Sequence, residues 1–222
     1  MKAFIIHLSK IQNSLASAQK LQQDLKSINI DAELFEGTYG SDAVDIFKKE
    51  NRSVHPINFK GVETLPEQAG KMQKPGVMGC FYSHYRLWKK CVELKETICI
   101  FEDDVNIVRP LVEVDFEEVL VLALGATKRR KYEEWYLKNP TGDPRAERYT
   151  NGSMPGTPGY MITPEAAKKL IKTYKNTYLP SDNAMNQAVI KIQIHSHLVG
   201  EANLDKHSLT KTTKFWSNFK NE

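Results

Sequence analysis

Residues 97–104 read TICIFEDD, an apolar run that ends abruptly in three carboxylates. Such a run predicts a buried central strand, and in open α/β sheets ligands bind beyond the carboxyl ends of strands. The carboxylates of Glu102, Asp103 and Asp104 repel one another unless a cation compensates their charge. On an extended chain Glu102 and Asp104 share one face, a spacing that suits a hard divalent cation held by carboxylates and substrate phosphates. A solvated surface turn is the alternative interpretation.

The segment before this strand, residues 77–95, predicts a helix. Its apolar residues cover so wide an arc at helical spacing that the helix should be mostly buried. Gly76, Gly79, Ser83 and His84 lie in its first turns. Glycines at a helix start allow a ligand to approach the backbone closely, and the free N–H groups there favour anions. His84 is therefore either a satisfied core residue or a polar contact to a sugar or phosphate.

The remaining segments extend this pattern in both directions along the chain. Strands are expected over residues 3–8, 32–35, 116–124, 159–163 and 189–198, and helices over residues 9–28 and 164–175, the latter capped by Thr163. This order of elements predicts an α/β fold. Long loops are expected at residues 51–75 and 126–158, and the absence of a linker predicts a single domain over residues 1–222.

Composition excludes several broad classes of protein. The 222 residues are 41% hydrophobic and 26% charged, which is typical of a globular chain. The net charge of only +4, and the two glutamates that follow the basic residues 128–131, argue against a nucleic-acid partner. The apolar runs are too short for a signal peptide or a bilayer span. Cys80, Cys91 and Cys99 cannot all pair, and we interpret them as reduced core residues of a soluble cytoplasmic protein.

Two further motifs contain polar residues beside glycine or proline. The first is residues 156–160, GTPGY, and the second is residues 179–183, LPSDN. Asp182 could cap a helix over residues 183–191. Alternatively, it could act as a general base or accept a hydrogen bond from a sugar hydroxyl. The sequence has no P-loop, no dinucleotide-binding glycine motif, no nucleophile elbow and no H-E-x-x-H motif, which argues against those enzyme classes.

Taken together, these motifs resemble glycosyltransferase family 25, the lipooligosaccharide galactosyltransferase group. The likeness covers most of the chain. The quoted matches are Phe35-Glu-Gly-Thr-Tyr-Gly40, Gly76-x-x-Gly79-Cys80-x-x-Ser83-His84, Glu102-Asp103-Asp104, Gly156-x-x-Gly159-Tyr160 and Pro180-x-Asp182. The glycine-rich helix followed at this separation by the acidic triplet is the most specific part of the match.

The resemblance implies a GT-A-like, Rossmann-like mixed sheet flanked by helices. It also implies transfer, with inversion, of a hexose from a UDP-sugar to a lipooligosaccharide or lipopolysaccharide acceptor, as in a β-1,4-galactosyltransferase. Mn²⁺ or Mg²⁺ would be held by Asp104 with Asp103 and Glu102. The two catalytic residues would be Asp104, through the cation, and Asp182, as the general base. The donor would contact His7, Gly40, Gly79, Ser83, His84, Glu102, Asp103, Gly159, Tyr160 and Asn183.

Other functions remain open at this stage. They are a glucosyltransferase of the same pathway, a catalytically silent module that binds a nucleotide sugar or carbohydrate, and a nucleotidyltransferase. The basic, aromatic tail at residues 206–222 is expected to contact the cytoplasmic face of the inner membrane, with a frayed terminus as the alternative.

Overall fold

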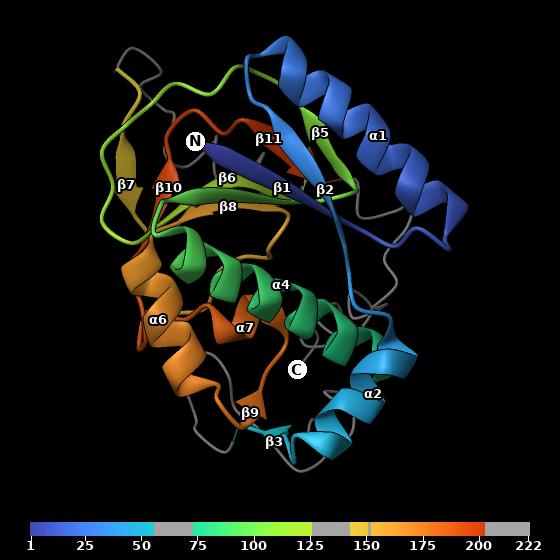
Figure 1. Ribbon diagram of the computed structural model, residues 1–222. Helices are drawn as coiled ribbons and strands as arrows, with labels where there is room; N and C mark the ends of the chain where they lie inside the picture. The colour runs from blue at the N-terminus through green and yellow to red at the C-terminus, as the bar shows by residue number, and fades with distance from the viewer. Residues whose placement is uncertain (56–72, 126–142, 151, 203–222) are drawn as a thin grey trace, which may run out of the picture.

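A mixed β-sheet with helices against both of its faces forms the centre of the protein (Figure 1). The computed structural model describes residues 1–55, 73–125, 143–150 and 152–202. The predicted α/β architecture, a mixed sheet flanked by helices, is confirmed.

The elements of the described chain have the following bounds. They are β1 (Lys2–His7), α1 (Gln12–Ser27), β2 (Ala32–Glu36), α2 (Gly40–Lys49), β3 (Ser53–Val54), α4 (Pro75–Leu94), β4 (Ile98–Glu102), β5 (Val105–Ile107), β6 (Val119–Gly125), β7 (Ala146–Arg148), β8 (Gly159–Ile162), α6 (Pro164–Thr173), β9 (Thr177–Tyr178), α7 (Ser181–Ala184), β10 (Ile192–His195) and β11 (Gly200–Ala202).

The strand order of the main sheet determines which strand ends lie at the same edge. The order is β2-β1-β4-β8-β6-β10-β7, and β11 pairs with β6 and β5. β1 is parallel to β2 and β4, so the carboxyl ends of these three strands lie at the same edge. β8 is antiparallel to β4, so β8 begins at the edge where β4 ends. One edge of the sheet therefore collects the segments that follow β1, β2 and β4 and the segment that precedes β8.

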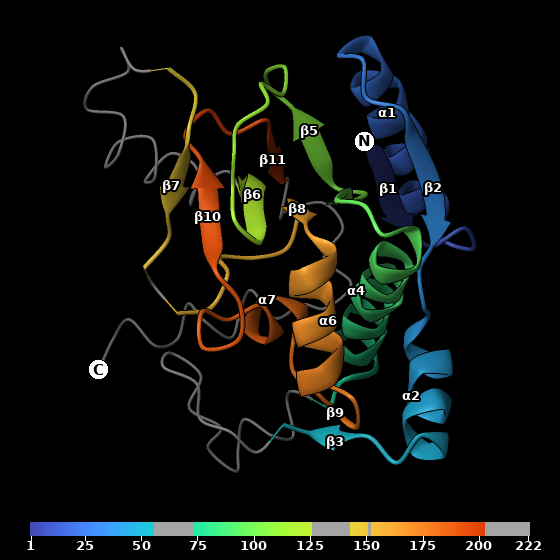
Figure 2. The same ribbon diagram turned by 60° about the vertical axis from the view of Figure 1, so that its left-hand side comes forward.

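The two faces of the sheet pack against different helices, as Figures 1 and 2 show. On one face, Leu21 of α1 belongs to the same buried cluster as Phe101 of β4. On the other face, Trp88 of α4 and Leu170 of α6 belong to a cluster with Ile100 of β4. Successive residues of β4 thus point alternately towards α1 and towards α4, as expected for a strand buried on both sides.

Two glycines allow α4 to lie directly against the start of α2. A Cβ atom on Gly79 would be 2.5 Å from the carbonyl oxygen of Thr38, and one on Gly40 would be 2.7 Å from the carbonyl carbon of Pro75. Side chains at these positions would push the two segments apart. The glycines therefore fix the N-terminus of α4 beside the connection that follows β2.

Most of the predicted elements are present, with small differences in their bounds. The strand before the carboxylates, the buried helix α4 and the parallel unit β1-α1-β2 are confirmed. Thr163 caps α6 as expected, since its hydroxyl accepts a hydrogen bond from the backbone N–H of Ala166 at 3.3 Å. The strand predicted over residues 189–198 is shorter, because β10 covers only Ile192–His195.

The helix over residues 183–191, which was one of the alternatives for Asp182, is not formed. α7 ends at Ala184, and the chain then turns around Asn186. The side-chain oxygen of Asn186 accepts a hydrogen bond from the N–H of Ala188, and its carbonyl oxygen accepts one from the N–H of Ile190. An asparagine that binds nearby backbone in this way competes with helix formation.

Some predictions concern residues outside the described part of the chain. The tail at residues 206–222 lies there, as do large parts of the predicted loops at residues 51–75 and 126–158. Among the residues that the structure does describe, none of the helices has both the length and the apolarity that a bilayer span requires.

Candidate active site

The acidic triplet lies at the edge of the sheet where β1 and β4 end. Ile6 of β1 is paired with Glu102 of β4, so His7 and Asp103 leave the sheet side by side. Asp103 and Asp104 form the turn between β4 and β5. The carboxylates thus lie at the position where open α/β sheets bind ligands.

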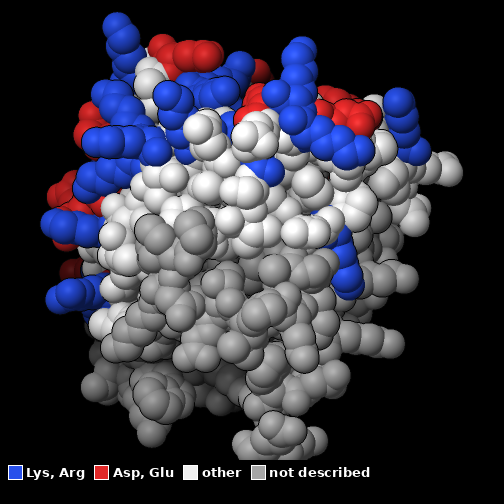
Figure 3. All heavy atoms as spheres, turned by 90° about the horizontal axis from the view of Figure 1, so that it is seen from below, with Lys and Arg blue, Asp and Glu red and all other residues white. Residues whose placement is uncertain are grey.

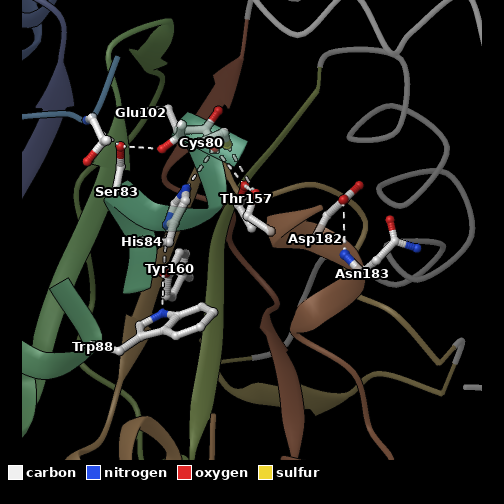
Figure 4. Close-up of polar contacts among 12 residues, drawn as sticks. Cys80, Ser83, His84, Trp88, Glu102, Thr157, Tyr160, Asp182 and Asn183 are labelled. Atoms are coloured by element: carbon white, nitrogen blue, oxygen red, sulfur yellow. Dashed lines mark hydrogen bonds and ion pairs between the residues drawn. The ribbon is translucent and has the colours of Figure 1, made fainter. Parts of the chain in front are cut away.

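Glu102 and Asp103 extend to opposite sides of the sheet. The carboxylate of Asp103 accepts a hydrogen bond from the hydroxyl of Ser14, on α1. The carboxylate of Glu102 lies on the α4 side, where His84 Nε2 is 3.1 Å away (Figure 4). The alternation of an extended strand therefore continues to the end of β4, and each carboxylate has its own partner.

A chain of hydrogen bonds runs from the core to Glu102. Trp88 Nε1 is 3.0 Å from the hydroxyl of Tyr160, and that hydroxyl is 2.9 Å from His84 Nδ1. An indole N–H can only donate, so the Tyr160 hydroxyl accepts from Trp88 and has its own hydrogen to donate to Nδ1. His84 then carries its proton on Nε2 and donates it to Glu102. His84 is accordingly a buried residue whose two ring nitrogens both have hydrogen-bond partners, and it also contacts the candidate site.

Thr157 connects the end of β4 to α7. Its hydroxyl donates to Glu102 Oε1 at 2.6 Å and lies 2.9 Å from the hydroxyl of Ser181. Ser181 is in turn 3.2 Å from the Sγ atom of Cys80. Ser181 is the first residue of α7, the short helix that also carries Asp182 and Asn183.

The two outer carboxylates of the triplet have opposite pKa shifts. Burial raises the pKa of Glu102, but the hydrogen bonds from His84 and Thr157 outweigh it, and the pKa is lowered. Burial, together with the charges of Glu102 and Asp103, raises the pKa of Asp104 to about 8. The surroundings therefore stabilise the charge on Glu102 and destabilise the charge on Asp104.

Two buried polar atoms at this edge have no hydrogen-bond partner among the described residues. They are Oδ1 of Asp104 and Nδ1 of His7. The other ring nitrogen of His7 is 3.9 Å from the carboxylate of Glu36, at the end of β2. Buried polar groups in proteins are nearly always satisfied, so these two atoms indicate a site that a ligand would complete.

The carboxylates fit a hard divalent cation. Asp104 offers an oxygen without a partner among the described residues, and its pKa is raised by burial and by the charges of Glu102 and Asp103. Carboxylate oxygens are the ligands that Mg²⁺ and Mn²⁺ prefer. Asp103 and Glu102 are close enough to destabilise the Asp104 charge, but each has a hydrogen-bond partner of its own. Asp104 is therefore the principal candidate ligand.

Four other predicted donor contacts make interactions within the protein. Ser83 Oγ accepts from the N–H of Thr38 at 2.8 Å and donates to the carbonyl of Gly79 at 2.7 Å, so it holds α4 against the segment after β2. Gly40 and Gly79 serve that same packing. Gly159, the first residue of β8, lies where a Cβ atom would be 2.8 Å from the ring of Phe101. These residues shape the surroundings of the carboxylates.

Asp182 and Asn183 lie on α7, the short helix that begins at Ser181. The N–H of Asn183 donates to Asp182 Oδ1 at 3.0 Å, and Figure 4 shows both side chains set apart from Glu102 and His84. Burial raises the pKa of the Cys80 thiol, and the charges of Glu102, Asp182 and Asp104 raise it further. Three carboxylates from two elements therefore act on one thiol, which places Asp182 within electrostatic reach of the site.

Thr157, Ser181 and Cys80 were not identified as site residues from the sequence. Thr157 and Ser181 do lie inside the two quoted polar motifs, but only the antiparallel pairing of β8 with β4 brings Thr157 to Glu102. The interpretation as a core residue holds only in part for Cys80, which is half-buried and whose Sγ contacts the hydroxyl of Ser181. Cys91 and Cys99 are buried, and all three thiols are free, as predicted.

Comparison with known proteins gives one family match. A family model described as "Glycosyltransferase family 25 (LPS biosynthesis protein)" matches residues 1–185. The matched range includes all the elements of the candidate site.

Three relatives are similar over parts of the chain. The lipooligosaccharide biosynthesis protein lex-1 of Haemophilus influenzae is 31% identical over 145 residues, which cover 58% of this chain and 47% of that protein. Procollagen galactosyltransferase 1-A of Xenopus laevis is 28% identical over 110 residues, 47% of this chain and 16% of that protein. A glycosyltransferase 25 family member of Anopheles gambiae is 26% identical over 181 residues, 75% of this chain and 28% of that protein. The chain thus spans about half or less of the length of these relatives.

Proposed function

The chain belongs to glycosyltransferase family 25, and from this premise we propose that it transfers a hexose from a UDP-sugar to a hydroxyl group of a lipooligosaccharide or lipopolysaccharide acceptor, with inversion at the anomeric carbon. The observation that carries the proposal is the acidic triplet at the carboxyl end of β4, where a buried oxygen of Asp104 has no partner among the described residues. A nucleotide sugar would bind at this edge of the sheet.

Asp104, with Asp103 and Glu102, would hold Mn²⁺ or Mg²⁺ and, through it, the diphosphate of the donor. When bound, the cation supplies a Lewis acid that neutralises the charge of the departing nucleoside diphosphate. His84 and Thr157 keep Glu102 ionised and fixed in direction. Tyr160 orients the His84 ring from the core side.

Asp182 would accept the proton of the acceptor hydroxyl. Inversion requires a base on the side of the sugar opposite to the leaving group. In support of this role, Asp182 lies on α7, a different element from the triplet, and its charge acts on the Cys80 thiol together with the charges of Glu102 and Asp104. His7, Gly40, Gly79, Ser83, Gly159 and Asn183 would line or support the donor pocket.

The sugar and the acceptor are proposed from the names of the relatives. Two procollagen galactosyltransferases from Xenopus laevis match this chain, which favours galactose. The relative from Haemophilus influenzae is named for lipooligosaccharide biosynthesis, which favours that acceptor. Transfer to such an acceptor would take place in the cytoplasm, at the inner membrane. A glucosyltransferase and a silent nucleotide-sugar-binding module are the alternatives that the experiments must separate.

Thermal unfolding with nucleotides tests the donor site. The protein is heated with UDP, UDP-galactose, UDP-glucose, GDP or CMP, each with Mn²⁺ or with EDTA. Saturation at about 100 times Kd stabilises a protein by ~2.7 kcal/mol, which corresponds to a rise of roughly 5–10 °C in Tm for a chain of this size. A rise that requires Mn²⁺ and a uridine nucleotide supports the proposal. Equal melting temperatures in all mixtures would contradict it.

Turnover separates the transferase from the silent module. Release of UDP from UDP-galactose is followed with extracted lipooligosaccharide as acceptor, for the wild type and for Asp104→Asn. A transferase should lose at least ~100-fold in kcat in this variant while its circular dichroism spectrum stays unchanged. A silent module would bind the donor but release no UDP in either form. UDP-glucose in the same assay ranks the two sugars.

A further inference from the structure

Three different metal-binding side chains meet at the base of the candidate site. The Sγ atom of Cys80, a ring nitrogen of His84 and a carboxylate oxygen of Glu102 all lie within 4.8 Å of one another. We propose that these residues form a second cation site, selective for a thiophilic divalent ion such as Zn²⁺. The proposal does not depend on the transferase activity, although Glu102 would be shared with the hard-cation site.

The positions of the ligands follow from rigid elements. Cys80 and His84 are four residues apart on α4, so they share one face of that helix, and Glu102 ends the buried strand β4. His84 Nε2 and Glu102 Oε1 are 3.1 Å apart. Tetrahedral Zn²⁺, with Zn–N and Zn–O distances of about 2.1 Å, separates two such ligands by roughly 3.4 Å. The nitrogen and the oxygen are thus already near the required spacing.

The Sγ atom of Cys80 needs to move only a small distance to complete the site. A tetrahedral zinc ion places sulfur and nitrogen ligands roughly 3.6 Å apart, given Zn–S near 2.3 Å. The sulfur lies within 4.8 Å of the other two ligand atoms, so a shift of at most about 1 Å completes the triangle. The hydroxyls of Ser181 and Thr157 lie beside the sulfur and the carboxylate and can hydrogen-bond to a water in the fourth position.

The other ring nitrogen of His84 also has a fixed partner, the hydroxyl of Tyr160. A metal-bound histidine usually donates its other ring N–H to a fixed partner. Nδ1 of His84 faces the hydroxyl of Tyr160 at 2.9 Å, and that hydroxyl would become the acceptor when the cation takes Nε2. The tyrosine hydrogen then loses its acceptor, so we expect a weaker site than a structural zinc site.

The chemistry of binding balances without an oxidant or a reductant. The thiol of Cys80 releases one proton, and the neutral His84 ring moves its proton from Nε2 to Nδ1. One thiolate and one carboxylate then neutralise the 2+ charge. A thiolate ligand selects Zn²⁺ and Co²⁺ over Mg²⁺ and Mn²⁺, which distinguishes this site from the carboxylate site around Asp104.

Cobalt titration tests the proposal directly. Tag-free, reduced, metal-free full-length protein is titrated with Co²⁺, and thiolate-to-cobalt charge transfer is followed in the near-ultraviolet. The sequence contains three cysteines, all in the described residues, so the band can arise only from Cys80, Cys91 or Cys99. We expect the band to saturate at one equivalent and to disappear when Zn²⁺, which binds more tightly, is added.

Matched variants assign the band to its residue. Cys80→Ser should abolish it, whereas Cys91→Ser and Cys99→Ser should retain it. Asp104→Asn should also retain it, and this separates the thiolate site from the proposed donor site. The absence of a band in the wild type, or a band that persists in Cys80→Ser, would overturn the proposal.

Protection from alkylation gives a second measurement that needs no variant. Iodoacetamide labelling of the wild type is mapped to each cysteine with and without Zn²⁺. Zinc should slow the labelling of Cys80 by at least ~10-fold relative to labelling without metal, and Cys91 and Cys99 should be unaffected. Equal rates at Cys80 with and without zinc would also refute the site.

Discussion

At the scale of single residues, Asp104 is the carboxylate whose charge the fold disfavours. Its pKa is about 8, because it is buried beside Glu102 and Asp103. In the unfolded chain an aspartate has a pKa near 3.9. Between these two pH values the folded protein keeps a proton that the unfolded chain has lost, so this residue makes the free energy of unfolding fall as pH rises from about 4 to about 8.

Asp104→Asn should therefore stabilise the metal-free protein at high pH. The variant keeps the shape of the side chain and removes its charge. We expect a gain of about 1–3 kcal/mol in unfolding free energy at pH 8, since each unit by which the pKa of Asp104 is higher in the folded than in the unfolded protein corresponds to ~1.4 kcal/mol. The gain should nearly vanish at pH 4. Urea unfolding in EDTA at both pH values measures it, with Asp115→Asn, at an exposed aspartate, as control. A gain of the same size at both pH values would argue against this account.

Thr157 is expected to position Glu102 through one short hydrogen bond. Thr157→Val removes the hydroxyl at nearly constant volume, and Thr157→Ser keeps it. Loss of an outer-shell partner typically costs 10–100-fold in activity or metal affinity. We expect such a loss in kcat for the valine variant and near wild-type kcat for the serine variant, measured as UDP release. If both variants lose activity equally, the methyl group of Thr157 matters as much as its hydroxyl, and the hydrogen bond alone does not explain the role of this residue.

At the scale of elements, the contact between α4 and the segment before α2 depends on the lack of a side chain at Gly79. Gly79→Ala places a methyl group against the Thr38 carbonyl, and such overpacking typically costs about 1–3 kcal/mol. Higher helix propensity should recover less than about 1 kcal/mol of this. We expect a net loss of stability in urea unfolding. Glu93→Ala, at an exposed position of the same helix, is the control, and an equal or greater stability of Gly79→Ala would contradict the packing argument.

The elements that the sequence predicts well are those with a strong local signal. The apolar run of β4, the wide apolar arc of α4 and the Thr163 cap of α6 all depend on neighbouring residues. β5 and β11 were not predicted, because these three-residue strands depend on pairing over a long distance in sequence, β5 with β11 and β11 also with β6.

The same reasoning explains what the sequence indicates about the site. The acidic triplet and His84 are visible as local patterns, and the structure brings them together. Thr157 and Ser181 join them only because β8 returns antiparallel beside β4 and α7 follows α6. The opposite pKa shifts of Glu102 and Asp104 depend on these tertiary contacts, so composition alone could not predict them.

At the scale of the whole molecule, charge is the property most relevant to an acceptor at a membrane. The chain carries a net charge of +4. Figure 3 shows lysine and arginine side chains along the upper and left-hand borders of the described surface, with acidic side chains among them. Exposed lysines occur on α2 and α6. If the acceptor lies at a membrane as proposed, we expect such a surface to make weak, salt-dependent contact with anionic lipids.

Deletion of residues 211–222 should weaken that contact. This tail carries three lysines and three aromatic residues, and basic and aromatic side chains bind the membrane interface. We expect at least a ~3-fold loss of co-sedimentation with vesicles of phosphatidylglycerol and phosphatidylethanolamine, and an unchanged Tm shift with UDP and Mn²⁺. Lys168→Gln with Lys172→Gln, on exposed positions of α6, is the charge control. Unchanged sedimentation of the truncated protein would refute a membrane role for the tail.

The chain of hydrogen bonds behind Glu102 begins at an indole ring. Trp88 is completely buried, and its N–H leads through Tyr160 and His84 to that carboxylate. A variant of the protein with Trp135→Phe and Trp216→Phe would keep Trp88 as its single tryptophan. The fluorescence of the remaining indole should then change whenever His84 reverses its hydrogen bond to Tyr160. The protein thus contains its own optical reporter, which could follow cation binding in real time without an added dye.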